Sequence, residues 1–132
     1  MDAKKALSWA GILGAISVIV LALAAHALEK KLDAAQLNAI KTAGNIQLIH
    51  AVALLAIGGS SEKLLGQLKN AIRCMLIGTC LFSFSIYIIM FKNIAGLEFL
   101  RFIWPITPIG GVVIISSWLM IFVQSRNLGK SN

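Results

Sequence analysis

Residues 6–28 read ALSWAGILGAISVIVLALAAHAL and contain no Asp, Glu, Lys or Arg. A helix of this length rises far enough to cross the roughly 30 Å hydrocarbon core of a bilayer. Three more uncharged runs follow, at 42–61, 74–91 and 102–125. The chain is 58% hydrophobic and only 13% charged, whereas soluble domains carry about 25% charged residues. The sequence therefore predicts an all-α, polytopic membrane protein, an antiparallel bundle of four transmembrane helices.

The end of the first run also resembles the cleavage region of a secretory signal peptide. Residues 22–32 read ALAAHALEKKL, with Ala25 and Ala27 in an Ala-x-Ala arrangement. The apolar run that precedes them is much longer than the roughly 7 to 15 residues of a signal-peptide core. We therefore expect a retained first helix.

One membrane domain is expected over residues 1–132, because a chain of 132 residues with four spans has no room for a separate soluble module. The expected helices are 6–28, 34–58, 71–91 and 107–124, with segments 62–69 and 93–104 in the membrane interface. Asp33 and Gln36 form a capping-box pattern that starts the second helix early enough to span. Thr107 is expected to cap the fourth helix, with Pro108 at its first position.

Few polar side chains fall inside the predicted spans, and their spacing places several on common helix faces. Gln47 and His50 share one face of the second helix, and Thr79, Ser83 and Tyr87 follow each other at four-residue steps in the third. Such groups are costly against lipid, so we expect a polar interior. Its candidate residues are His26, Gln47, His50, Ser83, Tyr87, Thr107 and Ser117. Small residues that let helices approach closely are expected at Gly11, Ala15, Ala22, Gly110 and Gly111.

Basic residues account for the net charge of +7 and lie at the helix ends. Basic flanks of this kind anchor helices in lipid, and no arginine-rich face with interleaved aromatics suggests nucleic-acid binding. Seven Lys and Arg residues fall on the side of the termini and five on the other. This asymmetry predicts that both termini lie in the cytoplasm.

The residues offer little chemistry for a metal, a cofactor or catalysis. His26 and His50 are the only histidines, and antiparallel helices place them at different depths, so no haem or metal site is expected. No carboxylate lies inside a predicted span, and no Ser/His/Asp set or Cys-x-x-Cys occurs. Cys74 and Cys80 point to different sides of one helix. We expect no cofactor and no enzyme activity.

Four short motifs together resemble the YgdD-type family of small inner-membrane proteins of unknown function. They are AHAL at 25–28, IQLIHAVALL at 46–55, LFSFSIY at 81–87 and TPIGG at 107–111, followed by Trp118. The chain departs from the family pattern at Ala25, at Ile46 in place of a tyrosine and at Phe84 in place of a glycine. The resemblance covers nearly the whole chain and implies a four-helix fold without an established chemistry.

Two functions remain open from the sequence. The first is a non-catalytic accessory or assembly subunit that packs against other membrane proteins or a second copy of itself. The second is a small transporter or channel-like protein whose interior around Gln47, His50 and Tyr87 admits a solute. Intramembrane ionisable residues favour the second function, whereas the lack of a membrane-buried carboxylate favours the first.

Overall fold

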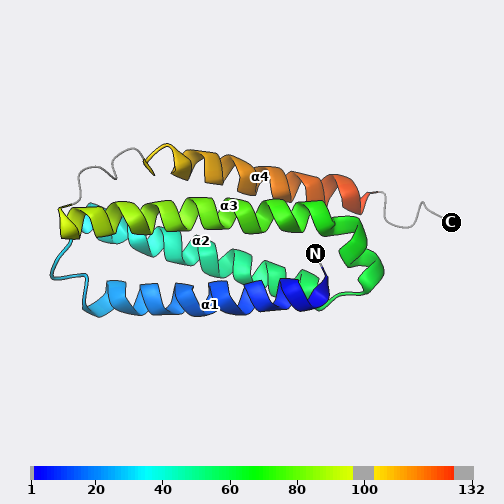
Figure 1. Cartoon of the computed structure of the whole chain (residues 1–132), viewed down its shortest axis with the longest axis horizontal. Coiled ribbons are helices and arrows are strands. Elements are labelled where there is room, and N and C mark those ends of the chain that lie inside the picture. Colours follow the sequence, from blue (N-terminus) through cyan, green and yellow to red (C-terminus); the bar gives the residue numbers. More distant parts are fainter. Residues whose placement is uncertain (1, 97–102, 127–132) are drawn as a thin grey trace.

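The computed structural model describes residues 2–96 and 103–126, which form four helices. They are α1 (Ala3–His26), α2 (Ala34–Gly58), α3 (Glu62–Ala95) and α4 (Ile106–Ser125). Each is long and apolar enough to cross a bilayer. Successive helices run in opposite directions, so the start of α1 and the end of α4 lie at the same end of the molecule (Figure 1). The predicted class, an antiparallel four-helix membrane protein, is confirmed.

Local sequence sets the helix starts. The Asp2 carboxylate accepts from the Lys5 N–H at 2.8 Å and caps α1. Asp33 and Gln36 form the predicted capping box at the start of α2. The prediction for α4 is wrong. This helix follows Pro105 without a side-chain cap, because the Thr107 hydroxyl is paired with Ser85 instead.

The segment 62–69, predicted to be separate, is the first part of α3. It bends across the end of the bundle at the right of Figure 1 and continues without a break into the long helix. Leu65 and Leu68 are only 3% and 5% exposed, so its leucines face the protein core. The 34 residues of α3 rise about 50 Å, more than one hydrocarbon core. Half of the second predicted interfacial segment, 93–104, falls on residues 97–102, outside the described part of the chain.

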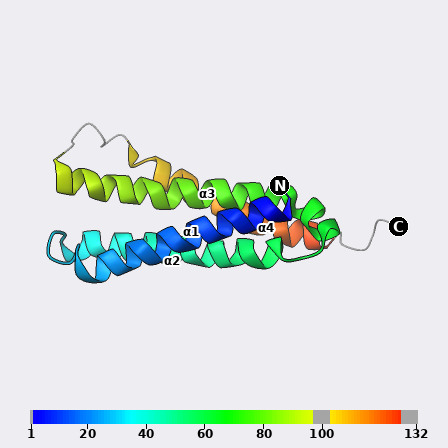
Figure 2. The ribbon, with the colours of Figure 1, turned by 60° about the horizontal axis from the view of Figure 1, so that its bottom comes forward.

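The four helices form a flattened arrangement with α2 and α3 at its centre. The extensive contacts are between α1 and α2, between α3 and α4, and between α2 and α3. Figure 1 shows α1 and α4 along opposite edges, and in the turned view of Figure 2 α1 lies in front and α4 behind. Accordingly 39% of the membrane-spanning stretch is buried in α2 and in α3, whereas only 22% is buried in α1 and 17% in α4. The two outer helices present most of their surface to lipid.

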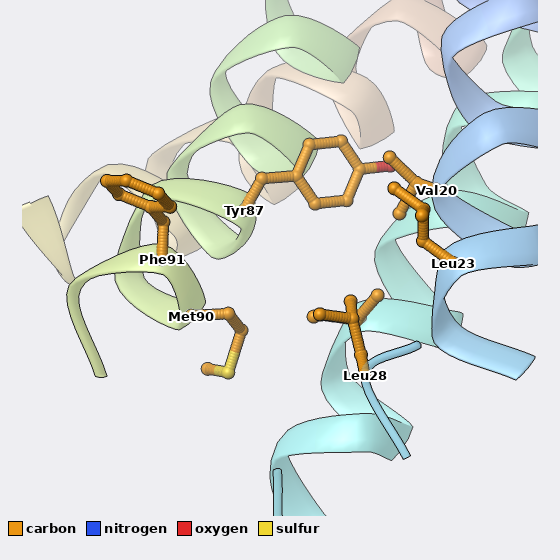
Figure 3. A pocket seen from close by; sticks show the side chains of 7 residues that line it. Val20, Leu23, Leu28, Tyr87, Met90 and Phe91 are labelled. Atoms are coloured by element: carbon orange, nitrogen blue, oxygen red, sulfur yellow. The ribbon is translucent and has the colours of Figure 1, made fainter. Parts of the chain in front are cut away.

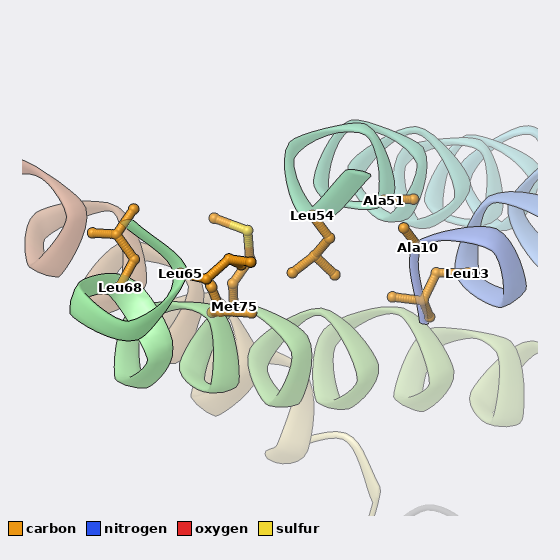
Figure 4. Packing of buried hydrophobic residues seen from close by; sticks show 8 residues of the cluster. Ala10, Leu13, Ala51, Leu54, Leu65, Leu68 and Met75 are labelled. Atoms are coloured by element: carbon orange, nitrogen blue, oxygen red, sulfur yellow. The ribbon is translucent and has the colours of Figure 1, made fainter. Parts of the chain in front are cut away.

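The apolar core fills the end of the bundle near the termini. Figure 4 shows Leu65 and Met75 of α3 beside Leu54 of α2, with Ala10 and Leu13 of α1 next to them. Leu13, Leu54 and Met75 are completely buried. The polar side chains lie further along the bundle, beyond this core.

Candidate functional site

The polar interior is centred on one face of α2. Gln47 and His50 lie one helical turn apart on the face that also buries Ala43, Ala51 and Leu54. Gln47 is 0% exposed and His50 is 4% exposed. Buried amides and imidazoles need hydrogen-bond partners, so their surroundings decide what this site can do.

Gln47 joins three helices through its side-chain amide. Its Nε2 donates to the backbone oxygen of Leu13 in α1 at 2.8 Å. Its Oε1 accepts from the Tyr87 hydroxyl of α3 at 3.1 Å. Both ends of the amide are therefore occupied by groups of the same chain.

His50 is held between its own helix and α4. Its Nδ1 lies 2.6 Å from the backbone oxygen of Ile46, and its Nε2 accepts from the Trp118 indole N–H at 3.1 Å. The two rings meet edge to face, with centroids 6.0 Å apart. A carbonyl accepts only and an indole donates only, so both bonds form together when the single proton is on Nδ1. This arrangement corresponds to the Nδ1–H tautomer of the imidazole.

Hydroxyl groups add further bonds between helices. The Ser17 hydroxyl of α1 donates to Gly44 O of α2 at 2.7 Å, and the Ser83 hydroxyl of α3 donates to Ala43 O at 3.1 Å. Ser85 and Thr107 pair through their hydroxyls at 2.6 Å and join α3 to α4. Each adjacent pair of helices therefore shares at least one polar contact.

The structure brings together part of the predicted polar set. Gln47 and Tyr87 bond to each other, and His50 and Ser83 each bond separately to a backbone oxygen of α2. Thr107 joins a separate pair with Ser85. Ser117 is buried but bonds within α4 to Ile114 O. The prediction for His26 is wrong, because it is exposed at the end of α1, where the helix leaves the bundle.

The sequence-based site missed three contributors, which are Ser85, the partner of Thr107, together with Ser17 and Trp118. Ser17 is completely buried and stands seven residues after Ala10, in phase with the face of α1 that contacts α2. This position on the helix could have identified Ser17 as a buried residue from the sequence. Trp118 is 46% exposed, so its ring faces lipid while its N–H turns inward. The spacing of residues along the helix could not predict this arrangement.

The predicted helix-packing residues divide into two groups. Gly110 is buried where α3 and α4 cross, and a Cβ placed on it would lie against the backbone N of Phe82 and 2.8 Å from its Cα. Gly111 has room for a Cβ in ordinary contact. Gly11, Ala15 and Ala22 do not pack within the chain: all three are exposed. The buried face of α1 is formed instead by Ala6, Ala10, Leu13, Ser17 and Ala24.

Charged groups take no part in this interior. No Asp, Glu, Lys or Arg is buried among the side chains that the structure describes, in residues 2–91, 96 and 103–126. In the described part of the chain no three His, Cys, Asp or Glu side chains group as metal ligands would. Cys74 and Cys80 are free thiols. Chemically, the site is a set of neutral donors and acceptors matched to each other, and its direct effect is to hold the helices together.

The chain is similar to known proteins over most of its length. A family described as "Protein of unknown function (DUF423)" matches residues 20–111. A membrane protein of Staphylococcus saprophyticus described as UPF0382 is 36% identical, covering 85% of this chain and 92% of that protein. The UPF0382 membrane protein YwdK of Bacillus subtilis is 35% identical, covering 86% and 93%. The UPF0382 inner membrane protein YgdD of Escherichia coli K12 is 30% identical, covering 98% and 95%. No solved structure matches the chain.

Proposed function

Because the chain belongs to the DUF423 family, an uncharacterised family of membrane proteins, we propose its role from its own residues: a non-catalytic accessory or assembly subunit of a bacterial inner membrane. In this proposal the polar interior fixes the shape of the four-helix unit. The outer faces of α1 and α4 then pack against other membrane proteins or against a second copy.

The observation that carries this proposal is the closure of the polar interior. Both ends of the Gln47 amide and both nitrogens of the His50 ring are bonded to groups of this chain. A transported solute needs polar groups that can exchange partners, and a catalytic base needs a free lone pair directed at a substrate. The matched network supports a structural role over either of these.

The exposed side of α1 supports docking. Gly11, Ala15 and Ala22 stand on it at spacings of four and seven residues and have no neighbour within this chain that uses their small size. Lipid tails are as apolar as leucine, so helices associate in membranes through close packing, which small residues permit. This face offers a partner helix a close approach.

Affinity purification from native membranes in mild detergent, followed by mass spectrometry, tests the proposal. We expect partner chains in fixed ratio with the wild-type protein, and their loss in Ala15→Phe and Ala22→Phe. Ile77→Phe is the matched control, since Ile77 is 54% exposed on α3, outside the proposed docking faces, and this variant should keep the partners. Recovery of a lone monomer from the wild-type membranes would remove the support for the subunit role.

The transporter alternative makes an opposite prediction. If a solute crosses through the interior, flux into proteoliposomes falls when His50 is changed to Ala. Under the structural proposal, the reconstituted wild-type protein gives no flux above empty liposomes. A reproducible flux that depends on His50 would replace our proposal with the alternative.

We also propose that both termini face the cytoplasm. In the sequence, seven Lys and Arg residues fall on the side of the termini and five on the other, Lys92 and Arg101 among them. Basic residues are retained on the cytoplasmic side. A fluorescent protein fused to the carboxyl terminus should fluoresce, and an alkaline phosphatase fusion at the same place should be inactive. The reverse pattern contradicts this orientation.

A further inference from the structure

An apolar cleft lies between α1 and α3 at the end of the bundle remote from the termini. It has a volume of about 160 Å³. Its lining consists of Val20, Leu23, Leu28, Ile40, Tyr87, Met90 and Phe91. Figure 3 shows Tyr87 and Met90 projecting from α3 toward Val20, Leu23 and Leu28. Ile40 of α2 is buried below them. The cleft exists because α1 and α3 make few contacts with each other. Only side chains therefore fill the space between these two helices next to α2.

The chemistry of the lining selects an apolar occupant. The only side-chain oxygen or nitrogen among the lining residues is the Tyr87 hydroxyl, and it already donates to Gln47. A polar solute would leave its own groups unpaired in this space, which costs several kcal/mol per group. A comparable cavity of about 150 Å³ holds a molecule the size of benzene, so this cleft takes a stretch of hydrocarbon. It is too narrow for a helix, whose diameter is about 10 Å.

The position of the cleft matches one leaflet of a bilayer. From Val20 to His26, where α1 ends, the helix rises about 9 Å, and Leu28 follows in the turn beyond it. The cleft therefore extends over more than half of the roughly 15 Å that one leaflet contributes to the hydrocarbon core. The unbranched Met90 side chain can adjust to a flexible chain. An acyl chain entering from the membrane surface would therefore follow the cleft inward.

Positive charge lies at the outer end of the cleft. Lys30 and Lys31 are exposed and follow directly after Leu28, in a turn closed by the Lys31 N–H donating to Leu28 O at 2.9 Å. Lys41 is exposed next to Ile40. The nearby acidic residues are Glu29 and Asp33, whose carboxylate accepts the Gln36 N–H in the capping box of α2, and the three lysines outnumber them. An anionic headgroup would find two adjacent lysines here.

We propose that this cleft binds one acyl chain of an anionic glycerophospholipid whose phosphate lies against Lys30 and Lys31. The site is separate from the docking face of α1 and does not depend on the proposed subunit role. Bound lipid would fill the gap between α1 and α3 and fix their spacing at this end.

Native mass spectrometry of the purified chain, released from micelles with phosphatidylglycerol or phosphatidylcholine added, tests the proposal. We expect one retained phosphatidylglycerol per wild-type chain. Leu23→Trp, which fills the cleft, should abolish retention. Ile19→Trp, a control 58% exposed on α1 outside the cleft, should keep it. Lys30→Gln and Lys31→Gln should each lower the preference for phosphatidylglycerol about fivefold, because a lysine near an anionic headgroup contributes about 1 kcal/mol.

Photo-crosslinking of the wild-type protein gives a second test that needs no variant. Phosphatidylglycerol with a diazirine in its acyl chain should label the peptides that contain residues 20–28 and 90–91. Labelling spread over the outer faces of α1 and α4 would overturn the proposal, as would wild-type chains that retain no lipid or retain both lipids equally. A dimer without lipid, crosslinked through residues 20–28, would assign the cleft to a second copy and also overturn it.

Discussion

Replacing Gly110 with Ala should separate α3 from α4. Gly110 is buried at their crossing, and an added Cβ would lie 2.8 Å from Phe82 Cα and 3.0 Å from the backbone oxygen of Gly78. These are backbone atoms, which cannot rotate aside as a side chain would. The two helices must therefore move apart, which weakens the contact between Ser85 and Thr107 as well.

The neighbouring Gly111 provides the reference for the magnitude. Its Cβ would make ordinary contact with the Phe82 ring at 3.8 Å. Both substitutions gain helix propensity of about 1 kcal/mol, so this gain cancels when the two variants are compared. Forcing one methyl group into a packed interface costs about 1 to 3 kcal/mol. We expect the free energy of unfolding of Gly110→Ala to be lower than that of Gly111→Ala by this amount.

Unfolding by sodium dodecyl sulfate in mixed micelles, followed by circular dichroism, measures this difference. Gly111→Ala should unfold at a detergent fraction equal to or above that of the wild-type protein. Gly110→Ala should unfold at a lower detergent fraction than the wild-type protein. Equal midpoints for the two variants would refute the close crossing of α3 and α4.

Three further outcomes follow from the structure. In a double-mutant cycle of Gln47→Ala and Tyr87→Phe, we expect a coupling of about 0.6 to 1.7 kcal/mol from their hydrogen bond, and additive effects would contradict that bond. Leu54→Ala, at a completely buried position, should lower the free energy of unfolding by about 2 kcal/mol or more, whereas Leu55→Ala, at a position 53% exposed, should change it little; similar losses at both would place the core elsewhere. The bond from the Lys5 N–H lowers the pKa of Asp2 below its usual 3.8, so the cap is complete above that pH and is lost as the pH falls through the lower folded-state pKa. Hydrogen exchange at the Lys5 amide should therefore lose protection in acid, whereas Asp2→Asn, which caps without a charge, should remove this pH dependence.

The number of spans and the face of α2 could be predicted from the sequence because polar side chains mark them. Charged residues interrupt the apolar runs, and Gln47 and His50 point to the interior because lipid offers them no partner. The capping box at Asp33 fixed the start of α2 for a similar reason, since it is a local pattern that needs no tertiary contact.

The inner face of α1 could not be predicted from its small residues. In a membrane helix both the lipid-facing and the protein-facing sides are apolar, so hydrophobic periodicity carries little information. The stripe through Gly11, Ala15 and Ala22 is exposed, whereas Ser17 is completely buried. A single hydroxyl was therefore a better guide than several small side chains. Segment 62–69 was predicted to lie separately in the membrane interface, whereas Leu65 and Leu68 close the core.

The most direct test of the closed polar interior is the protonation of His50 in lipid bilayers, measured by solid-state nitrogen NMR on histidine-labelled protein. The signal of His26, which is exposed, is assigned and removed with His26→Gln. The account predicts a neutral His50 ring with its proton on Nδ1 and a correlation between His50 Nε2 and the Trp118 indole proton. A proton on Nε2, or on both nitrogens, would contradict it.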